Sequence, residues 1–290
     1  MNGFDISTIS SVYVGSTPYS SIYHGANLIW PTAPQPHNYS LDYFTIESLE
    51  DNNTIKIGKN KSPNNLSLSY STDDGETWTS LTISSAQDIT TINTGDKIIF
   101  KGVNNSIANA WDSYYRFNSS KNFKVYGNAM SLLFGDNFTS NSEFTSGTTF
   151  NLCGLFYGTT TLTDASNLIL PATTCTLSCY NGMFRGCTSL TVAPQLPAIY
   201  SAQDCYSSMF EGCINLEEAP AINLTNMSQA SCKRMFCMNR NSKITTPKMT
   251  KSPILHVATP ASNCYEEMFK GNGNIVEVTC LIETSNIACT

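Results

Sequence analysis

Charge is what this sequence has least of. Charged residues are 13% of its 290 residues, about half of the share usual in soluble proteins. The 16 Lys and Arg residues are scattered, and the first of them is Lys56. The sequence therefore has no basic stripe that could neutralise the phosphates of a nucleic acid, and its net charge of −6 would repel them. Nucleic-acid binding is not expected.

Long apolar runs are also missing, so no segment of the sequence is expected to insert into a membrane. Residues 1–20 contain Asp5 and neither Lys nor Arg, which is unlike a secretory signal peptide. We therefore expect a protein that is made in a cytoplasm and stays there.

Cysteine is absent from the first half of the chain, since all 11 cysteines lie between Cys153 and Cys289. An odd number cannot pair completely within one chain. Their spacings lack the paired C-x-x-C pattern of zinc sites, so we expect neither a metal site nor a cofactor. We predict that most are reduced thiols that fill the interior as small apolar side chains.

Ser, Thr and Asn take the place of the missing charge, and they suit turns and the solvent faces of strands better than helices. The 14 Phe, 14 Tyr and 3 Trp residues supply more apolar area than a disordered chain would carry. The composition therefore predicts a folded, mainly β protein.

The first segment, residues 1–30, contains a short internal copy. Residues 12–16 (VYVGS) and 22–26 (IYHGA) each read as a strand that ends at Gly, with Pro18 in the turn between them. Residues 28–30 (LIW) form a third apolar run.

Three such short strands bury too little area to be stable alone. We therefore interpret residues 1–30 as an anchor that rests on another protein, with Tyr13, Tyr23 and Trp30 as candidate contact residues because aromatic side chains make good interface centres. The same three residues could equally form the core of the module. The alternative is that the segment extends an edge of the next domain.

Residues 31–38 are Pro-rich and predict a stiff linker. Residues 39–128 then alternate apolar and polar side chains over short stretches, for example at 66–70, 90–92 and 97–101, with turn clusters between them. Short strands at regular spacing predict a small β-sandwich or barrel.

One turn in this segment matches the Asp-box of sialidases, with Ser71, Asp73, Gly75 and Trp78 at its defining positions. The box is a hairpin device in which the Asp accepts backbone hydrogen bonds, Gly adopts the unusual dihedral and Trp packs beneath. A sialidase needs several boxes and an arginine cluster, whereas this chain has one box and four arginines. We therefore predict a structural turn and no catalytic residues.

The third segment, residues 129–290, repeats. Residues 179–187 (CYNGMFRGC) match 205–213 (CYSSMFEGC), and 264–271 (CYEEMFKG) is a further copy. The Phe residues at 134, 156, 184, 210, 236 and 269 are 22, 28, 26, 26 and 33 residues apart. That period is typical of a solenoid.

Within each unit, Tyr, Met and Phe at i, i+3 and i+4 would share one face of a short helical turn that ends at Gly. A Leu three residues after the second Cys, as at Leu190 and Leu216, would begin a short strand. The predicted repeat core consists of Met183, Phe184, Cys187, Met209, Phe210, Cys213, Met268 and Phe269.

This repeat, over residues 152–290, resembles the bacterial surface leucine-rich repeats of the BspA type. The whole chain, by the motifs at 12–16, 70–78, 95–102 and 126–136, is similar to structural proteins of tailed phages that infect gut bacteria, crAss-like phages among them. The resemblance implies a virion role in which the opening module docks on the particle.

We therefore expect a non-enzymatic head or tail fibre or decoration protein that docks by its N-terminus on other virion proteins, forms a homo-oligomer, and displays its repeats to a host-surface glycan or protein. Two alternatives remain. One is a bacterial surface adhesin, which an export signal would favour; the other is a virion enzyme that cleaves glycans, which sugar release from host capsule would reveal.

Overall fold

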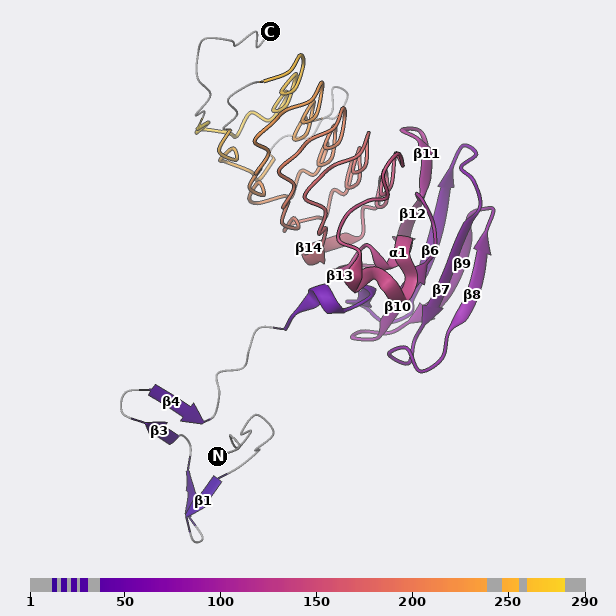
Figure 1. Cartoon of the computed structure of the whole chain (residues 1–290), viewed down its shortest axis with the longest axis vertical. Helices are drawn as coiled ribbons and strands as arrows, with labels where there is room; N and C mark the ends of the chain where they lie inside the picture. The colour runs from indigo at the N-terminus through magenta and orange to yellow at the C-terminus, as the bar shows by residue number, and fades with distance from the viewer. Residues whose placement is uncertain are drawn as a thin grey trace. The chain divides into compact units, whose positions relative to one another are not determined.

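The computed structural model describes the backbone of four strands between residues 12 and 30, and residues 37–238, 247–255 and 260–279 in full. The chain divides into two compact units, Met1–Asn38 and Tyr39–Thr290. Both are built mainly from β-strands in the described residues, as the composition predicted (Figure 1).

The smaller unit contains two two-stranded antiparallel hairpins. Their strands are β1 (Val12–Val14), β2 (Thr17–Tyr19), β3 (Ile22–His24) and β4 (Asn27–Trp30). The prediction that Pro18 lies in a turn was wrong, because Pro18 is in β2 and pairs in register with Tyr13. Proline is tolerated there since a strand at the edge of a sheet need not donate every N–H.

The larger unit begins with a six-stranded and a four-stranded sheet. In spatial order the first contains β14 (Leu162–Ile169), β13 (Phe123–Asn128), β5 (Phe44–Ser48), β10 (Lys97–Gly102), β7 (Leu66–Ser71) and β8 (Thr79–Ile83). The second contains β11 (Ala108–Ala110), β12 (Ser113–Ser119), β6 (Asn53–Asn60) and β9 (Gln87–Ile92). Three short helical segments, η1 (Tyr39–Leu41), α1 (Ser131–Phe134) and η2 (Gly135–Ser140), flank them.

The two sheets pack face to face. Along their strands, buried side chains that point to the other sheet alternate with partly exposed side chains that point away from it. In β6, for example, Ile55 and Ile57 are buried while their neighbours are not. Phe117 of β12 meets Phe44 of β5 and Phe100 of β10 at ring-centroid distances of 4.9 and 4.8 Å. These rings form the centre of the core between the sheets.

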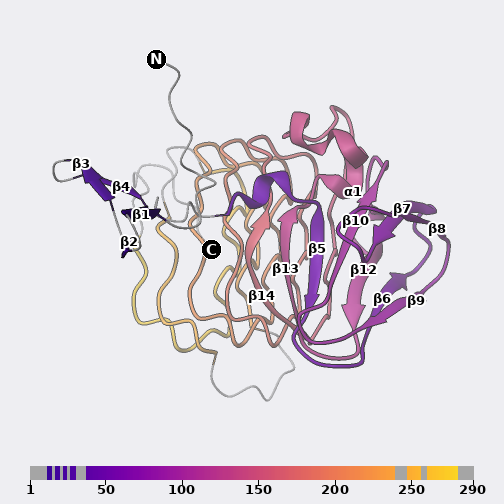
Figure 2. The same cartoon turned by 90° about the horizontal axis from the view of Figure 1, so that it is seen from below.

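The chain then winds into a series of coils, which we call the coil stack (residues 150–238, 247–255 and 260–279; Figures 1 and 2). Neighbouring coils are joined by backbone hydrogen bonds between residues roughly one repeat apart. Phe184 N–H donates to the Met209 carbonyl over 2.9 Å, and Tyr206 N–H donates to that of Ser231 over 2.8 Å. Each coil is therefore held in register with the next.

The repeated Cys-Tyr-x-x-Met-Phe segment is not the helical turn that we predicted. It is a run of consecutive tight turns in which every fourth residue has positive φ, as at Ser178 (54°), Gly182 (57°) and Gly186 (76°). Within a coil, Arg185 N–H donates to the Gly182 carbonyl over 3.1 Å, while alternate N–H groups point to the next coil. A continuous helix would direct its N–H groups along its own axis to carbonyls four residues earlier, so alternate N–H groups could not point to the next coil as they do here.

The short strand predicted to begin at Leu190 and Leu216 does not form as a continuous strand. Both leucines are buried, but among the described residues of the later coils only isolated bridges form, such as Val192 with Asp164 and Tyr200 with Asn226. The turn segment carries most of the contact between coils, so a regular strand on the other side is not required.

A column of stacked Phe rings runs through the coil stack. The centroids of Phe156, Phe184, Phe210, Phe236 and Phe269 are successively 5.3, 5.3, 5.6 and 5.8 Å apart, with interplanar angles of 14°, 2°, 3° and 7°. We call these five rings the phenylalanine column.

The sixth residue of the predicted series, Phe134, lies outside the phenylalanine column. It ends α1 and forms an antiparallel bridge with Val103. The first coil therefore begins later than the series predicted. The column continues into the sheets, since Phe156 lies 6.0 Å from Phe44 in the sandwich core.

The strand β14 joins the sheets to the coil stack. It pairs in parallel with β13 on one side. On the other side, the backbone N–H of Thr191 in the next coil donates to the Thr163 carbonyl over 2.9 Å. One hydrophobic cluster consequently runs from the sheets into the coils. The domain boundary predicted from the sequence, between residues 128 and 129, thus falls inside the compact unit Tyr39–Thr290.

Within the part of the chain that the structure describes, no helix has the length and apolar character needed to cross a bilayer.

Candidate binding groove

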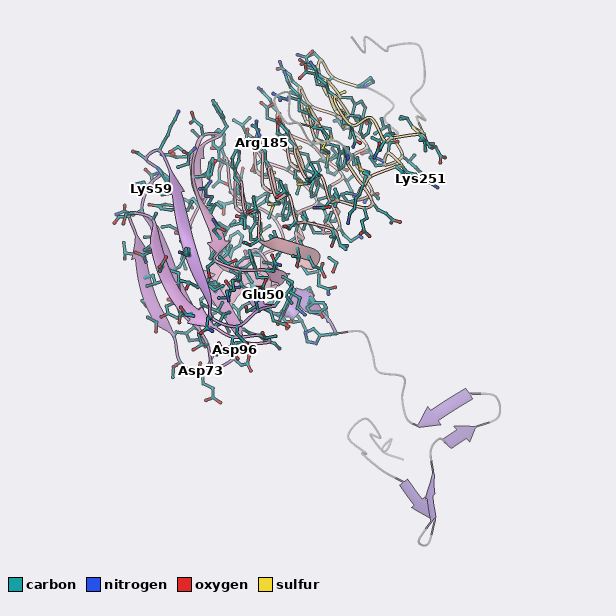
Figure 3. The ribbon with its side chains drawn as sticks, turned by 180° about the vertical axis from the view of Figure 1, so that it is seen from behind. Glu50, Lys59, Asp73, Asp96, Arg185 and Lys251 are labelled. Atoms are coloured by element: carbon teal, nitrogen blue, oxygen red, sulfur yellow. The ribbon has the colours of Figure 1, made fainter. Side chains whose placement is uncertain are left out.

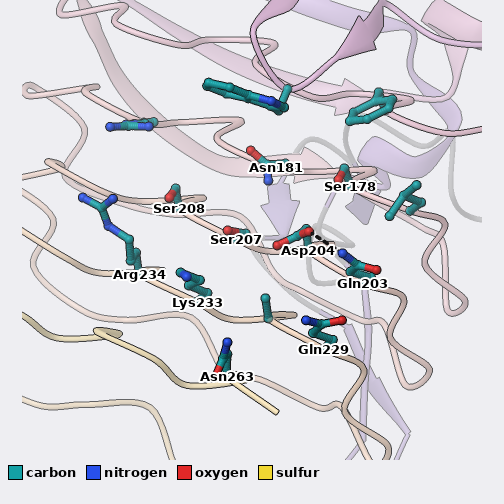
Figure 4. Close-up of a pocket in the computed structure, with 15 residues that line it drawn as sticks. Ser178, Asn181, Gln203, Asp204, Ser207, Ser208, Gln229, Lys233, Arg234 and Asn263 are labelled. Atoms are coloured by element: carbon teal, nitrogen blue, oxygen red, sulfur yellow. Dashed lines mark hydrogen bonds between the residues drawn. The ribbon is translucent and has the colours of Figure 1, made fainter. Parts of the chain in front are cut away.

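A groove of about 560 Å³ opens on the outer face of the coil turns. Its floor consists of side chains from equivalent positions of successive coils, which lie beside one another because the coils are in register. Asn181, Ser207 and Lys233 form one such row, seen on successive coils in Figure 4. A second row contains Ser178 and Asp204.

Amides extend the floor. Gln203 and Gln229 precede the second row on adjacent coils, and Gln203 donates to the Asp204 carboxylate over 3.2 Å. Asn263 lies at the far end of the groove. The floor therefore repeats hydroxyl and amide groups from coil to coil, at the separation of about 4.8 Å that backbone hydrogen bonding imposes.

The rim opposite this floor contains Trp111, at the tip of the hairpin that joins β11 to β12. Its side chain is 63% exposed. The hairpin tip is fixed by an ion pair between Asp112 and Lys61, and by the Asn60 amide, which donates to the Asp112 carbonyl over 2.8 Å. Lys61 Nζ lies 5.9 Å from the centre of the indole. A large aromatic surface is thus held in place yet open to solvent.

The cations of the groove are paired within the protein. Arg185 and Arg234 donate to the same oxygen of Glu211, over 3.0 and 2.9 Å, and Glu211 is 2% exposed. Arg185 also lies 5.4 Å above the ring of Tyr157. Partial burial is the largest influence and acts to lower the pKa of Arg234, but Glu211, Cys237 and Glu267 together outweigh it and the pKa is raised.

The third cation that lines the groove, Lys233, forms an ion pair of 2.8 Å with Glu266. Because these three cations have carboxylate partners, the groove carries no uncompensated positive patch. A ligand therefore needs no negative charge to balance these cations.

The four residues predicted to form a structural turn lie together between β7 and β8, at an end of the sheets that also contains Asp96 (Figure 3). The Ser71 hydroxyl donates to Asp73 over 2.6 Å and accepts from the Gly75 N–H over 2.9 Å. Asp73 accepts from the backbone N–H of Thr77 over 2.9 Å. Hydrogen bonds from Ser71 and Thr77 lower the pKa of Asp73 to about 2.

Trp78 ties this turn to the rest of the sheet. Its indole N–H donates to the Gly75 carbonyl over 3.0 Å, and Lys101 Nζ lies 4.0 Å above the ring. Lys101 also donates to Asp136 over 2.8 Å, and Tyr43 donates to the same carboxylate over 2.7 Å. These bonds are directed within the protein and fasten the hairpin.

The residues predicted as repeat core lie inside the coil stack. Met183, Phe184, Cys187, Met209, Phe210, Cys213 and Met268 are buried, and Phe269, near the end of the described coils, is partly exposed.

The thiols of this interior face backbone carbonyls. The thiol of Cys187 donates to the Phe156 carbonyl over 3.1 Å, and the thiol of Cys213 donates to the Phe184 carbonyl over 3.0 Å. Burial raises the pKa of Cys213 to about 12 and holds that of Cys187 well above its usual range. Both thiols are therefore protonated at neutral pH. The cysteines from Cys153 to Cys237 form no disulfide in the described structure.

The predicted anchor residues Tyr13, Tyr23 and Trp30 lie in β1, β3 and β4, but their side chains are outside the described residues. His, Cys, Asp and Glu side chains in the described part of the chain form no group of three or more that could hold a metal ion.

The sequence reasoning did not identify the groove. One signal was available, because the two positions between Cys-Tyr and Met-Phe vary from copy to copy (Asn-Gly, Ser-Ser, Glu-Glu) while their neighbours are fixed. Asn181, Ser207 and Ser208, at those positions, line the groove. Trp111 carried no such signal, since its place opposite the coils depends on how the sheets meet the first coil.

Comparison of the chain with protein-family models, curated proteins and solved structures gives no match.

Proposed function

We propose that this protein is a non-enzymatic structural component of a phage virion, a head or tail fibre or decoration protein. Residues 1–30 dock on other virion proteins, and the protein assembles as a homo-oligomer. Residues 129–290 form a leucine-rich-repeat solenoid of the BspA type, which presents the groove to the host surface.

The observation that carries this proposal is the continuous interior of the larger unit. The phenylalanine column runs from the last described coil to Phe44 between the sheets, and the thiols around it are protonated and buried. Such an interior holds a long surface in one shape without reactive groups. A rigid, chemically inert body that varies only its outward residues suits a displayed attachment protein.

A second observation supports docking by the N-terminus. The two hairpins of Met1–Asn38 form a compact unit apart from Tyr39–Thr290. Two-stranded hairpins of three or four residues are marginal by themselves in water. A partner protein that covers them would supply the missing burial.

The test compares two variants in the phage. A deletion of residues 1–30 should yield a soluble, folded protein that is absent from purified particles, as measured by mass spectrometry of the particles. Trp111→Ala leaves the N-terminal unit intact, so it should be incorporated at the normal level. Normal incorporation of the deletion variant would contradict the docking proposal, and absence of the unaltered protein from particles would contradict the virion role.

A further inference from the structure

We propose that the groove between Trp111 and the coil turns binds an uncharged, extended glycan. This inference rests on the proposed function and assigns a ligand class and a site to it. Its basis is the combination of one exposed aromatic platform with a floor of repeated amides and hydroxyls.

The rim supplies an apolar contact suited to a sugar ring. The indole of Trp111 is 63% exposed on a hairpin tip that ion pairing and hydrogen bonding hold in place. Aromatic rings offer a large apolar surface at low conformational cost, and the C–H face of a pyranose packs against such a surface. Little ordering entropy is then lost when a ligand binds.

The floor supplies directional contacts. Ser207 and Asn181 lie on adjacent coils in one row, and Gln203 and Gln229 lie on adjacent coils in another. Each group can donate and accept, as a ligand rich in hydroxyl groups requires. Amides recur at Gln203 and Gln229, and Asn181 and Ser207 add an amide and a hydroxyl on adjacent coils, so the floor fits an extended polymer rich in hydroxyl groups.

We infer that the glycan is uncharged from the ion pairs of the groove. Arg185, Arg234 and Lys233 are each paired with a carboxylate of the protein. Drawing Arg185 or Arg234 away to bind an anion would leave the buried Glu211 with one of its two arginine partners, which costs stability. A protein ligand fits less well, because the centre of a protein interface is usually a desolvated aromatic or apolar cluster, whereas most of the side chains that line this groove are polar.

The test uses the purified full-length protein and two sets of probes. The first set contains neutral hexasaccharides of glucose, galactose, mannose and N-acetylglucosamine; the second contains polysialic acid and heparin oligosaccharides. Binding is measured by calorimetry at low and high NaCl. We expect at least one neutral probe to bind with an affinity that NaCl leaves unchanged, and neither anionic probe to bind.

Variants locate the site. Trp111→Ala should weaken binding about tenfold or more, and Gln203→Ala should weaken it to a smaller extent. The matched control is Tyr200→Ala, which removes another exposed aromatic side chain of the coil stack, 55% exposed and outside the groove. It should bind as the unaltered protein does.

Three results would overturn the inference: binding to none of the neutral probes, preference for the anionic probes, or equal losses for Trp111→Ala and Tyr200→Ala. Its failure can be told apart from that of the proposed function. Particles that incorporate the Trp111→Ala protein and adsorb to host cells normally would reject the glycan site while leaving the virion role in place.

Discussion

The phenylalanine column makes a quantitative prediction about where the coil stack gains its stability. Phe210 is fully buried and stacks on two rings, Phe184 and Phe236, at 5.3 and 5.6 Å. Phe269 is partly exposed, and its one stacked neighbour in the described structure is Phe236, at 5.8 Å. The same substitution at the two positions should therefore have different costs.

For Phe210→Ala, loss of a buried Phe and the cavity that remains cost about 3–5 kcal/mol. Each lost stacking contact adds about 0.5–1.5 kcal/mol beyond burial, so the total should be near 5 kcal/mol or more. Phe269→Ala loses one stacking contact and leaves a site open to water, and we expect about 2 kcal/mol. Phe210→Leu keeps most of the volume and should fall between them.

Urea denaturation followed by circular dichroism measures these free energies of unfolding, and the transition slope m checks that the unfolded states are comparable. The protein with Phe269→Ala is the matched control. Equal costs at the two positions would show that the stacked column does not determine stability. A cost of Phe210→Ala below about 2 kcal/mol would have the same meaning.

Three further predictions follow from the structure. Gly127→Ala should prevent folding or cost more than about 4 kcal/mol in urea denaturation, because φ is 79° and a Cβ would overlap the Tyr43 carbonyl oxygen; an unchanged midpoint would contradict it. The Asp73 carboxylate, whose pKa is lowered to about 2, should stabilise its turn above pH 4 and lose this effect as pH falls through about 2; two-dimensional NMR of the Thr77 amide would follow it, and a midpoint near the ordinary Asp value would refute it. The thiol of Cys213 should resist iodoacetamide in the native protein at pH 8, since its pKa is raised to about 12, and should react after denaturation; mass spectrometry of the labelled peptides would detect any native labelling that contradicts this.

Several parts of the fold were accessible from local sequence. The alternation at 66–70 and 97–101 predicted strands that the structure has as β7 and β10, because side chains alternate between the faces of a strand whatever its neighbours are. Mainly β structure also followed from composition. The periodic Phe residues predicted a solenoid, and the structure stacks the rings of five of the six.

Other parts were wrong because local spacing does not distinguish between solutions with the same periodicity. Tyr, Met and Phe at i, i+3 and i+4 fit a helical turn, but they fit equally well a run of tight turns with positive φ at Ser178 and Gly182. The choice depends on the next coil, whose carbonyls accept the N–H groups that a helix would use internally. Likewise, Phe134 shares the sequence pattern of the column but belongs to α1.

Which side chains are interior follows from the repeat pattern, since a residue repeated once per coil at a fixed offset must meet its own copies when the coils stack. Which body the coils pack against, and which surface they expose, depends on the packing of the whole larger unit. β14 pairs with β13 and merges the coil stack with the sheets into one core, and this union sets Trp111 across from the coil turns. Trp111 and the groove residues of the coils are far apart in the sequence. Whether they line one groove depends on how the sheets pack against the coil stack, which no local sequence pattern encodes.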